Sequence, residues 1–123
     1  MLGFRQLLGR SGEDSAARYL KKNKYRILER NYRNRLGEID IIAEDAGVIV
    51  FIEVKTRSGA GFGSPKEALT QKKQRNISMV ALSWLKTHNK FGKHARFDVV
   101  SIVSVNNELT IELVKNAFDL KFR

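Results

Sequence analysis

The chain has 123 residues, a length that suits one compact domain, and 42% of them are hydrophobic, which is enough to form a core. It has no cysteine, so disulfides and thiolate metal sites are excluded. No apolar run approaches the roughly 18 residues of a membrane span, and no signal-peptide core of sufficient length is present. With a mean hydropathy of −0.34, we expect a cytoplasmic protein without a membrane partner, folded as a single domain over residues 1–123.

Charge gives the first indication of function. Lysine and arginine number 23 against 13 acids, a net charge of +10, which favours a polyanion partner and above all nucleic acid. A ribosomal protein, a membrane-surface protein and general solubility are the alternatives. Residues 1–35 carry ten basic and three acidic residues, whereas residues 36–54 carry five acids and neither lysine nor arginine. A cation site would explain this acidic segment in a basic chain.

The pattern of apolar residues and turn residues predicts seven elements. In chain order these are a helix from Ser11 (as N-cap) to about Asn23, strands at 25–33, 38–43 and 48–55, a helix at 65–87 with Ser64 and Glu67 in capping-box spacing, and strands at 96–103 and 108–114. Three strands followed by a helical crossover predict an α/β fold. Its sheet should be mixed, five-stranded and flanked by helices, in the order α-β-β-β-α-β-β.

The segment VIVFIEVK, residues 48–55, predicts a central strand that is apolar on both faces. Glu53 and Lys55 lie two positions apart, so their side chains point to the same face of that strand. A buried charge without a partner is costly, so both groups need one. A local salt bridge between them, or an edge-strand position, is the structural alternative.

Asp40 is a second charge inside an apolar strand, between two isoleucines. A hairpin centred near Ala46 would place Asp40 opposite Ile52 or Glu53 on the neighbouring strand, within a few ångströms. Two carboxylates so placed repel each other unless a cation or a shared proton lies between them. With Lys55 adjacent, the arrangement suits a divalent metal and a cationic group that positions or activates water.

Glu13 is a candidate fourth member of this site. It precedes Ala16, Ala17 and Leu20 by three, four and seven positions, so it shares the core-facing stripe of the first helix. The alternative is an acid in the first helical turn, where the helix dipole favours negative charge.

Further charged residues have less specific roles. Asp98 is expected to be structural and to pair with Arg57 or Arg96, and the two histidines, His88 and His94, are too few and too widely spaced for a zinc site. Contacts with nucleic-acid phosphates are expected from Arg33, Arg35, Arg57, Lys72, Lys73 and Arg75.

Asp40 followed by Glu53-Val54-Lys55 has the D…ExK form of the PD-(D/E)XK, or restriction-endonuclease-like, superfamily. Ile39 is a departure, because the superfamily's name has a proline there. The chain also resembles the YraN-like family of small bacterial proteins and is similar to archaeal Holliday-junction resolvases. The resemblance to the family is carried by Gly12-Glu13, Ala17, Tyr19-Leu20, Asn31-Tyr32-Arg33, residues 37–42, residues 51–57 and residues 96–100.

The resemblance implies a restriction-endonuclease-like three-layer core and a metal-dependent endonuclease that cuts DNA in a structure-directed or weakly sequence-specific way. Asp40 and Glu53 would ligate Mg²⁺ or Mn²⁺, with the Val54 carbonyl as a further ligand. Lys55 would orient or activate the attacking water, and Glu13 would support the metal or its waters. Because related resolvases act as dimers, a homodimer is an open expectation.

Two other functions stay open at this point. The chain could be a non-catalytic nucleic-acid-binding module that keeps the nuclease fold. It could also be an adaptor that docks through the loop at 58–63 and the apolar tail Ala117–Leu120. The choice between DNA and RNA is left open by the sequence.

Overall fold

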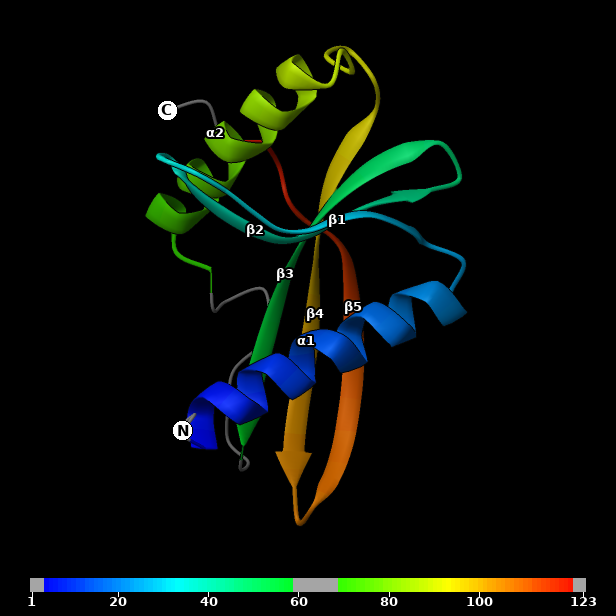
Figure 1. Cartoon of the computed structure of the whole chain (residues 1–123), viewed down its shortest axis with the longest axis vertical. Helices are drawn as coiled ribbons and strands as arrows, with labels where there is room; N and C mark the ends of the chain where they lie inside the picture. Colours follow the sequence, from blue (N-terminus) through cyan, green and yellow to red (C-terminus); the bar gives the residue numbers. More distant parts are fainter. Residues whose placement is uncertain (1–3, 59–68, 121–123) are drawn as a thin grey trace.

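The computed structural model describes residues 4–58 and 69–120, with side chains described from residue 12. The elements are α1 (Phe4–Lys22), β1 (Arg26–Asn34), β2 (Gly37–Asp45), β3 (Val48–Ser58), α2 (Gln71–Thr87), β4 (Ala95–Val105) and β5 (Glu108–Phe118). This confirms the predicted order and the mixed five-stranded sheet flanked by helices (Figure 1). Within the described ranges, no helix is both long enough and apolar enough to span a membrane.

The strands lie in the sheet in the order in which they occur in the chain, β1-β2-β3-β4-β5. β3 and β4 are parallel, and every other neighbouring pair is antiparallel. A parallel pair needs a long crossover connection, and α2 lies in the connection between β3 and β4. β3 therefore takes the central position that its apolar sequence predicts.

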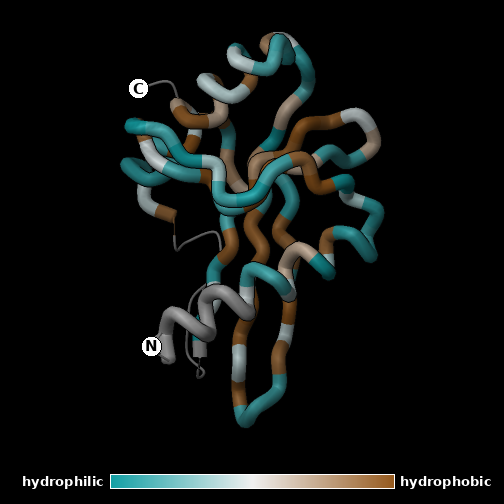
Figure 2. Tube along the Cα trace, viewed as in Figure 1, coloured by the Kyte–Doolittle hydropathy of each residue, from teal (hydrophilic) through white to brown (hydrophobic). Residues whose placement is uncertain are grey.

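Helices α1 and α2 cover opposite faces of the sheet and divide the core into two clusters (Figure 1). Ile49 and Phe51 of β3 pack on the α2 side, whereas the intervening Val50 and Ile52 pack on the α1 side with Leu20. Figure 2 shows the hydrophobic residues along the central strands and hydrophilic residues at the turns. Glu53 and Lys55 therefore lie in the second half of a strand whose first half is buried on both faces.

β2 twists sharply at Asp40. Its pairing with β3 ends at Ile41, and beyond that point Ile39 packs in the α2-side cluster although Ile41 packs in the α1-side cluster. On a regular strand, residues two positions apart would share a face. The β1–β2 turn consequently lies against α2, where a Cβ atom added at Gly37 would lie 3.4 Å from the Val80 side chain. Asp40 is thus the point at which β2 leaves β3.

The predicted helix starts need correction. α1 begins at Phe4, so Ser11 lies inside the helix and is not its N-cap. A capping pattern of this kind also occurs inside longer helices, so it does not by itself mark a helix start. α2 begins after Thr70, whose extended backbone (φ −67°, ψ 161°) rules out one continuous helix over 65–87. The predicted cap at residues 64–67 lies outside the described residues.

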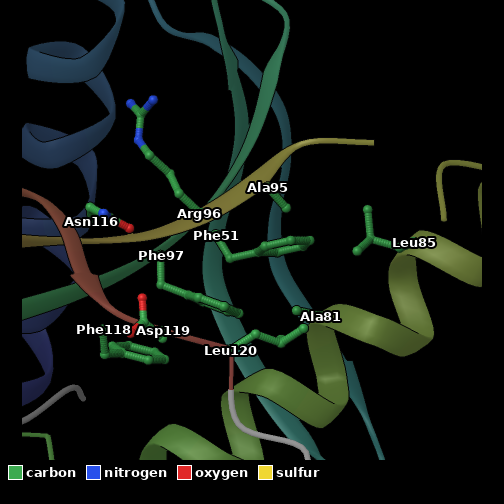
Figure 3. A pocket seen from close by; sticks show the side chains of 10 residues that line it. All are labelled: Phe51, Ala81, Leu85, Ala95, Arg96, Phe97, Asn116, Phe118, Asp119 and Leu120. Atoms are coloured by element: carbon green, nitrogen blue, oxygen red, sulfur yellow. The ribbon is translucent and has the colours of Figure 1, made fainter. Parts of the chain in front are cut away.

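The C-terminal segment is part of the core, so the expectation of an apolar tail free to dock on a partner is wrong. Ala117 and Phe118 are buried, and the Phe118 ring stacks on Phe97 with 4.6 Å between ring centroids. Beside them is a small apolar pocket of about 90 Å³, which Leu120 also lines (Figure 3). None of the predicted catalytic residues lines this pocket. Most of the predicted docking loop at 58–63 lies outside the described residues.

A buried polar network joins β4 to neighbouring elements. The Asp98 carboxylate accepts hydrogen bonds from the Tyr25 hydroxyl (3.0 Å), Arg96 Nε (3.0 Å) and the Asn116 amide (2.9 Å). Arg96 also donates to Asp45 at 2.6 Å. The predicted structural pairing of Asp98 is therefore confirmed, with Arg96 rather than Arg57 as the partner that these bonds identify.

α1 approaches β3 most closely at Gly12. A Cβ atom added at Gly12 would overlap the Oγ1 atom of Thr56. The absence of a side chain at this position therefore allows α1 to pack closely against β3. This close packing brings the next residue, Glu13, toward the charged residues of β3.

We expect Gly12→Ala to lower the free energy of unfolding by about 1–3 kcal/mol, because the helix must shift away from Thr56. Urea denaturation measures this loss. In a Thr56→Ala background the overlap is removed, so the same Gly12→Ala change should stabilise the protein by up to about 1 kcal/mol through helix propensity. An equal loss in both backgrounds would contradict the proposed contact.

Candidate active site

Asp40 is held at the edge of the central strand by a backbone hydrogen bond. The Val54 amide donates to Asp40 Oδ2 at 2.8 Å. On β3 the Ile49 amide donates toward β4, to the His94 carbonyl, so alternate amides such as that of Val54 point toward β2. Because β2 has already diverged, the Asp40 carboxylate takes the place that a strand carbonyl would occupy.

Glu53 is the second carboxylate of the site and carries two ammonium partners. Its side chain is only 11% exposed, and its Oε1 lies 3.2 Å from Lys55 Nζ and 3.0 Å from Lys73 Nζ. The local Glu53–Lys55 salt bridge foreseen as the structural alternative is therefore present. It does not stand alone, because Lys73 reaches the same oxygen from α2.

The pKa of Asp40 is shifted by burial and by the charges around it. Its pKa is raised from 3.8 to about 7, first by burial and next by the negative charge of Glu53. The Val54 amide bond works in the opposite direction, and the charge of Glu13 adds to the increase. A cation placed between Asp40 and Glu53 would favour the ionised form of Asp40.

The pKa values of Lys55 and Lys73 are shifted in opposite directions. Burial lowers the pKa of Lys55, and the neighbouring Lys73 lowers it further, although Glu53 opposes the shift. Burial also acts against the charged form of Lys73, but contact with Lys55 and the negative charges of Glu53 and Asp40 outweigh it and raise the Lys73 pKa. Lys55 is thus the ammonium of the pair that releases its proton more easily.

Glu13 faces a polar cavity of about 390 Å³, lined by Glu13, Asp14, Arg30 and Asn31. Arg30 Nη2 lies 2.8 Å from Asp14 Oδ1 and 3.7 Å from Glu13 Oε1. Glu13 Oε1 is buried and accepts no hydrogen bond from any residue that the structure describes. The cavity lies next to Asp40, because Asn31, which lines it, stands opposite Asp40 on the neighbouring strand. The Glu13 charge also raises the pKa of Asp40.

Arg30 and Asn31 belong to this region and were missed by the sequence analysis as site residues. Arg30 pairs with Ile41 and Tyr32 with Ile39, so Asn31 stands opposite Asp40. Asn31 has a left-handed backbone with φ of 55°, which asparagine tolerates better than most residues. An asparagine inside an otherwise alternating strand was the available signal, whereas Arg30 gave none beyond its charge.

The structure gathers some of the predicted site residues and separates others. Asp40, Glu53, Lys55 and Lys73 come together, and Glu13 lies in the adjoining cavity. Arg33 instead pairs with Glu38 at 2.8 Å on the β1–β2 hairpin. The other predicted phosphate contacts lie on the β1–β2 turn (Arg35, exposed), on β3 (Arg57, half-buried) and on α2 (Lys72, exposed, and Arg75, half-buried).

The carboxylates fit a divalent ion that depends on further ligands. No group of three or more His, Cys, Asp and Glu side chains among the described residues could hold a metal by itself. Mg²⁺ is commonly bound through one or two carboxylates, with water and substrate phosphate completing its coordination. Asp40 and Glu53 fit that mode, because a hard cation between them would offset the effect of the Glu53 charge on the Asp40 carboxylate.

Comparison with known proteins defines the family. The sequence profile described as "Uncharacterised protein family UPF0102" matches residues 12–102. A UPF0102 protein of Persephonella marina is 48% identical over 119 residues, which cover 97% of this chain and 99% of the relative. The chain belongs to UPF0102. UPF0102 proteins of Geobacter metallireducens (49% identical, 94% of each chain) and Clostridium botulinum (48% identical, 92% of this chain and 94% of the relative) are also similar.

The match confirms the resemblance to the YraN-like family. The segment matched by UPF0102 begins at Gly12 and includes Glu13, Asp40, Glu53, Lys55 and Lys73. All the residues gathered in the candidate site therefore lie in the part of the chain that the UPF0102 profile covers.

The raised pKa of Asp40 predicts how the stability of this UPF0102 chain depends on pH. Since the folded pKa is about 7 and the ordinary value 3.8, the stability contributed by the protonated group is complete below pH 3.8 and is lost as the pH rises through 7. Asp40→Asn stays neutral and can still accept the Val54 bond. Urea denaturation in EDTA should find it more stable than wild type by roughly 2–4 kcal/mol at pH 8.5, with the difference nearly gone at pH 4.

Asp45→Asn is the matched control. The pKa of Asp45 is lowered, chiefly by its hydrogen bond with Arg96, so this change should destabilise the protein at pH 8.5. A stability difference between Asp40→Asn and wild type that does not vary with pH would show that Asp40 is already ionised near pH 4.

Proposed function

We propose that the chain is a metal-dependent phosphodiesterase, an endonuclease that cuts DNA in a structure-directed or weakly sequence-specific way. The observation that carries the proposal is the proximity of two carboxylates on adjacent strands: Asp40, held by the Val54 amide at 2.8 Å, and Glu53, whose Oε1 lies 3.2 Å from Lys55 Nζ. The negative charge of Glu53 raises the pKa of Asp40. The order of these residues matches that of the restriction-endonuclease-like superfamily, which the D…ExK pattern resembles.

Each residue has a distinct role in this proposal. A bound Mg²⁺ or Mn²⁺ would polarise the scissile phosphate and lower the pKa of a water molecule. Asp40 and Glu53 would hold the ion, and the Val54 amide fixes the orientation of the Asp40 carboxylate. Lys55, with its lowered pKa, would orient the attacking water and exchange a proton with it at Nζ.

Charge and shape support nucleic acid as the substrate. The net charge of +10 attracts a polyanion, and two ammonium groups already converge on Glu53. The polar cavity beside the site brings Arg30 and Asn31 close to Asp40. Arg30 offers a planar cation and Asn31 an amide, and both groups suit contacts with the sugar-phosphate backbone.

A non-catalytic nucleic-acid-binding module is the second candidate, and one observation favours it. Glu53 already has two ammonium partners, so its charge is satisfied without a metal. Under this alternative, the carboxylates and lysines form a structural ion cluster, and the excess of basic residues serves binding alone.

Cleavage assays separate the two candidates. Branched, flapped and linear DNA of one sequence, and RNA of the same design, would be incubated with the protein and Mg²⁺ or Mn²⁺. We expect cleavage of at least one DNA, with Glu53→Gln and Lys55→Met slowed by about 100-fold or more, because each removes a group needed at the reacting phosphate.

Lys86→Met is the control for loss of one positive charge, since Lys86 is an exposed residue in the last turn of α2. It should cut at nearly the wild-type rate, and melting curves would verify that every variant is folded. If the wild type cuts nothing, or if Glu53→Gln cuts as fast as wild type, the catalytic proposal fails. Unchanged DNA binding in that case would support the binding module.

A further inference from the structure

Lys73 extends toward the candidate site from the first turn of α2, whose backbone is held by hydrogen bonds. Thr70 caps α2, and its Oγ1 accepts a hydrogen bond from the Lys73 amide at 3.1 Å. The buried Gln74 side chain donates to the Leu69 carbonyl at 3.0 Å, which fixes the same turn. The backbone of Lys73 is therefore anchored, while its side chain is 43% exposed and ends 3.0 Å from Glu53 Oε1.

The two lysines on Glu53 supply the positive charge that a divalent ion would bring. Both Nζ atoms lie within 3.2 Å of one oxygen, Oε1, on a side chain that is 11% exposed. A divalent ion bound to that oxygen would repel both ammonium groups at close range in a partly buried site. The ion and both lysines cannot keep their present contacts together.

The structure indicates which of the two lysines a divalent ion would displace from Glu53. Lys55 lies on β3 two residues from Glu53, and its side chain is 20% exposed. Lys73 comes from another element, is more than twice as exposed, and has a flexible four-carbon stem with open solvent available to it. Displacing Lys73 costs little burial and leaves a cation at the mouth of the site.

We propose that Lys73 is an internal counter-ion: it neutralises Glu53 in the metal-free protein, yields that carboxylate to the divalent ion, and then binds a phosphate oxygen of the nucleic acid beside the scissile bond. This rests on the proposed function, because it takes Asp40 and Glu53 as the metal ligands. Metal and nucleic acid would then bind cooperatively, since the phosphate gives the displaced ammonium a new partner. By linkage, each would strengthen binding of the other by the same factor.

Manganese binding without nucleic acid tests the first half of the proposal. Free Mn²⁺ would be measured by electron paramagnetic resonance during titration of wild type, Lys73→Met and Lys72→Met. We expect Lys73→Met to bind Mn²⁺ several-fold more tightly than wild type, because a competitor for Glu53 is gone. Lys72→Met removes the same charge from the neighbouring, exposed position and should stay within about twofold of wild type.

If Lys73→Met binds Mn²⁺ no more tightly than Lys72→Met, the counter-ion role is wrong. Lys73→Gln, which keeps a polar side chain, should reproduce the tightening found for Lys73→Met. Melting curves in EDTA would confirm that these variants are folded.

A duplex DNA with phosphorothioate linkages, chosen to resist cleavage, tests the second half. Its addition should raise the Mn²⁺ affinity of wild type by a larger factor than that of Lys73→Met. Equal factors in the two proteins would overturn the transfer of Lys73 to phosphate.

Two further variants separate failure of this inference from failure of the proposed function. If Asp40→Asn and Glu53→Gln bind Mn²⁺ as wild type does, the metal site itself is misplaced and both proposals fail. If these variants lose Mn²⁺ binding while Lys73→Met matches Lys72→Met, only the counter-ion role fails.

Discussion

The hydrogen bond from the Val54 amide to the Asp40 carboxylate is the contact on which the site depends. It stands where the β2–β3 ladder ends, and it satisfies a backbone amide that would otherwise lose its strand partner. It also holds a carboxylate against a second carboxylate, Glu53, in a partly buried position. Asp40 is therefore the residue at which β2 turns toward α2. It is also the residue that meets the charged side chains of β3.

The site draws its charges from separate elements, which makes its electrostatics sensitive to how those elements pack. β2 and β3 supply the carboxylates, and α2 supplies Lys73. α1 approaches at Gly12 and brings in the negative charge of Glu13. The Asp98–Arg96 network stabilises the sheet away from this site by tying β4 to β5 and Asp45. Packing on both faces of the sheet thus brings together a charged cluster whose members come from separate elements.

The proximity of Asp40, Glu53 and Lys55 could be predicted because it follows from local rules, namely the two-residue period of strands and the position of one turn. The β2–β3 pairing ends with Ile41 opposite Ile52, so the next residue, Asp40, lies near Glu53 without being paired with it. The place of Lys73 at Glu53 could not be predicted, because it depends on how α2 packs on the sheet. The cap assigned to Ser11 was wrong because a short capping pattern also occurs inside a longer amphipathic helix.

In the proposed function, a divalent ion binds between Asp40 and Glu53, beside the Val54 amide. Paramagnetic broadening of backbone amide signals during a Mn²⁺ titration of the ¹⁵N-labelled protein tests it directly. We expect the Val54 signal to be among the first lost, at Mn²⁺ levels that leave the β4–β5 turn unaffected, and to persist in Asp40→Asn. Broadening centred on another acidic residue such as Glu44, or a Val54 signal lost equally in Asp40→Asn, would contradict the claim.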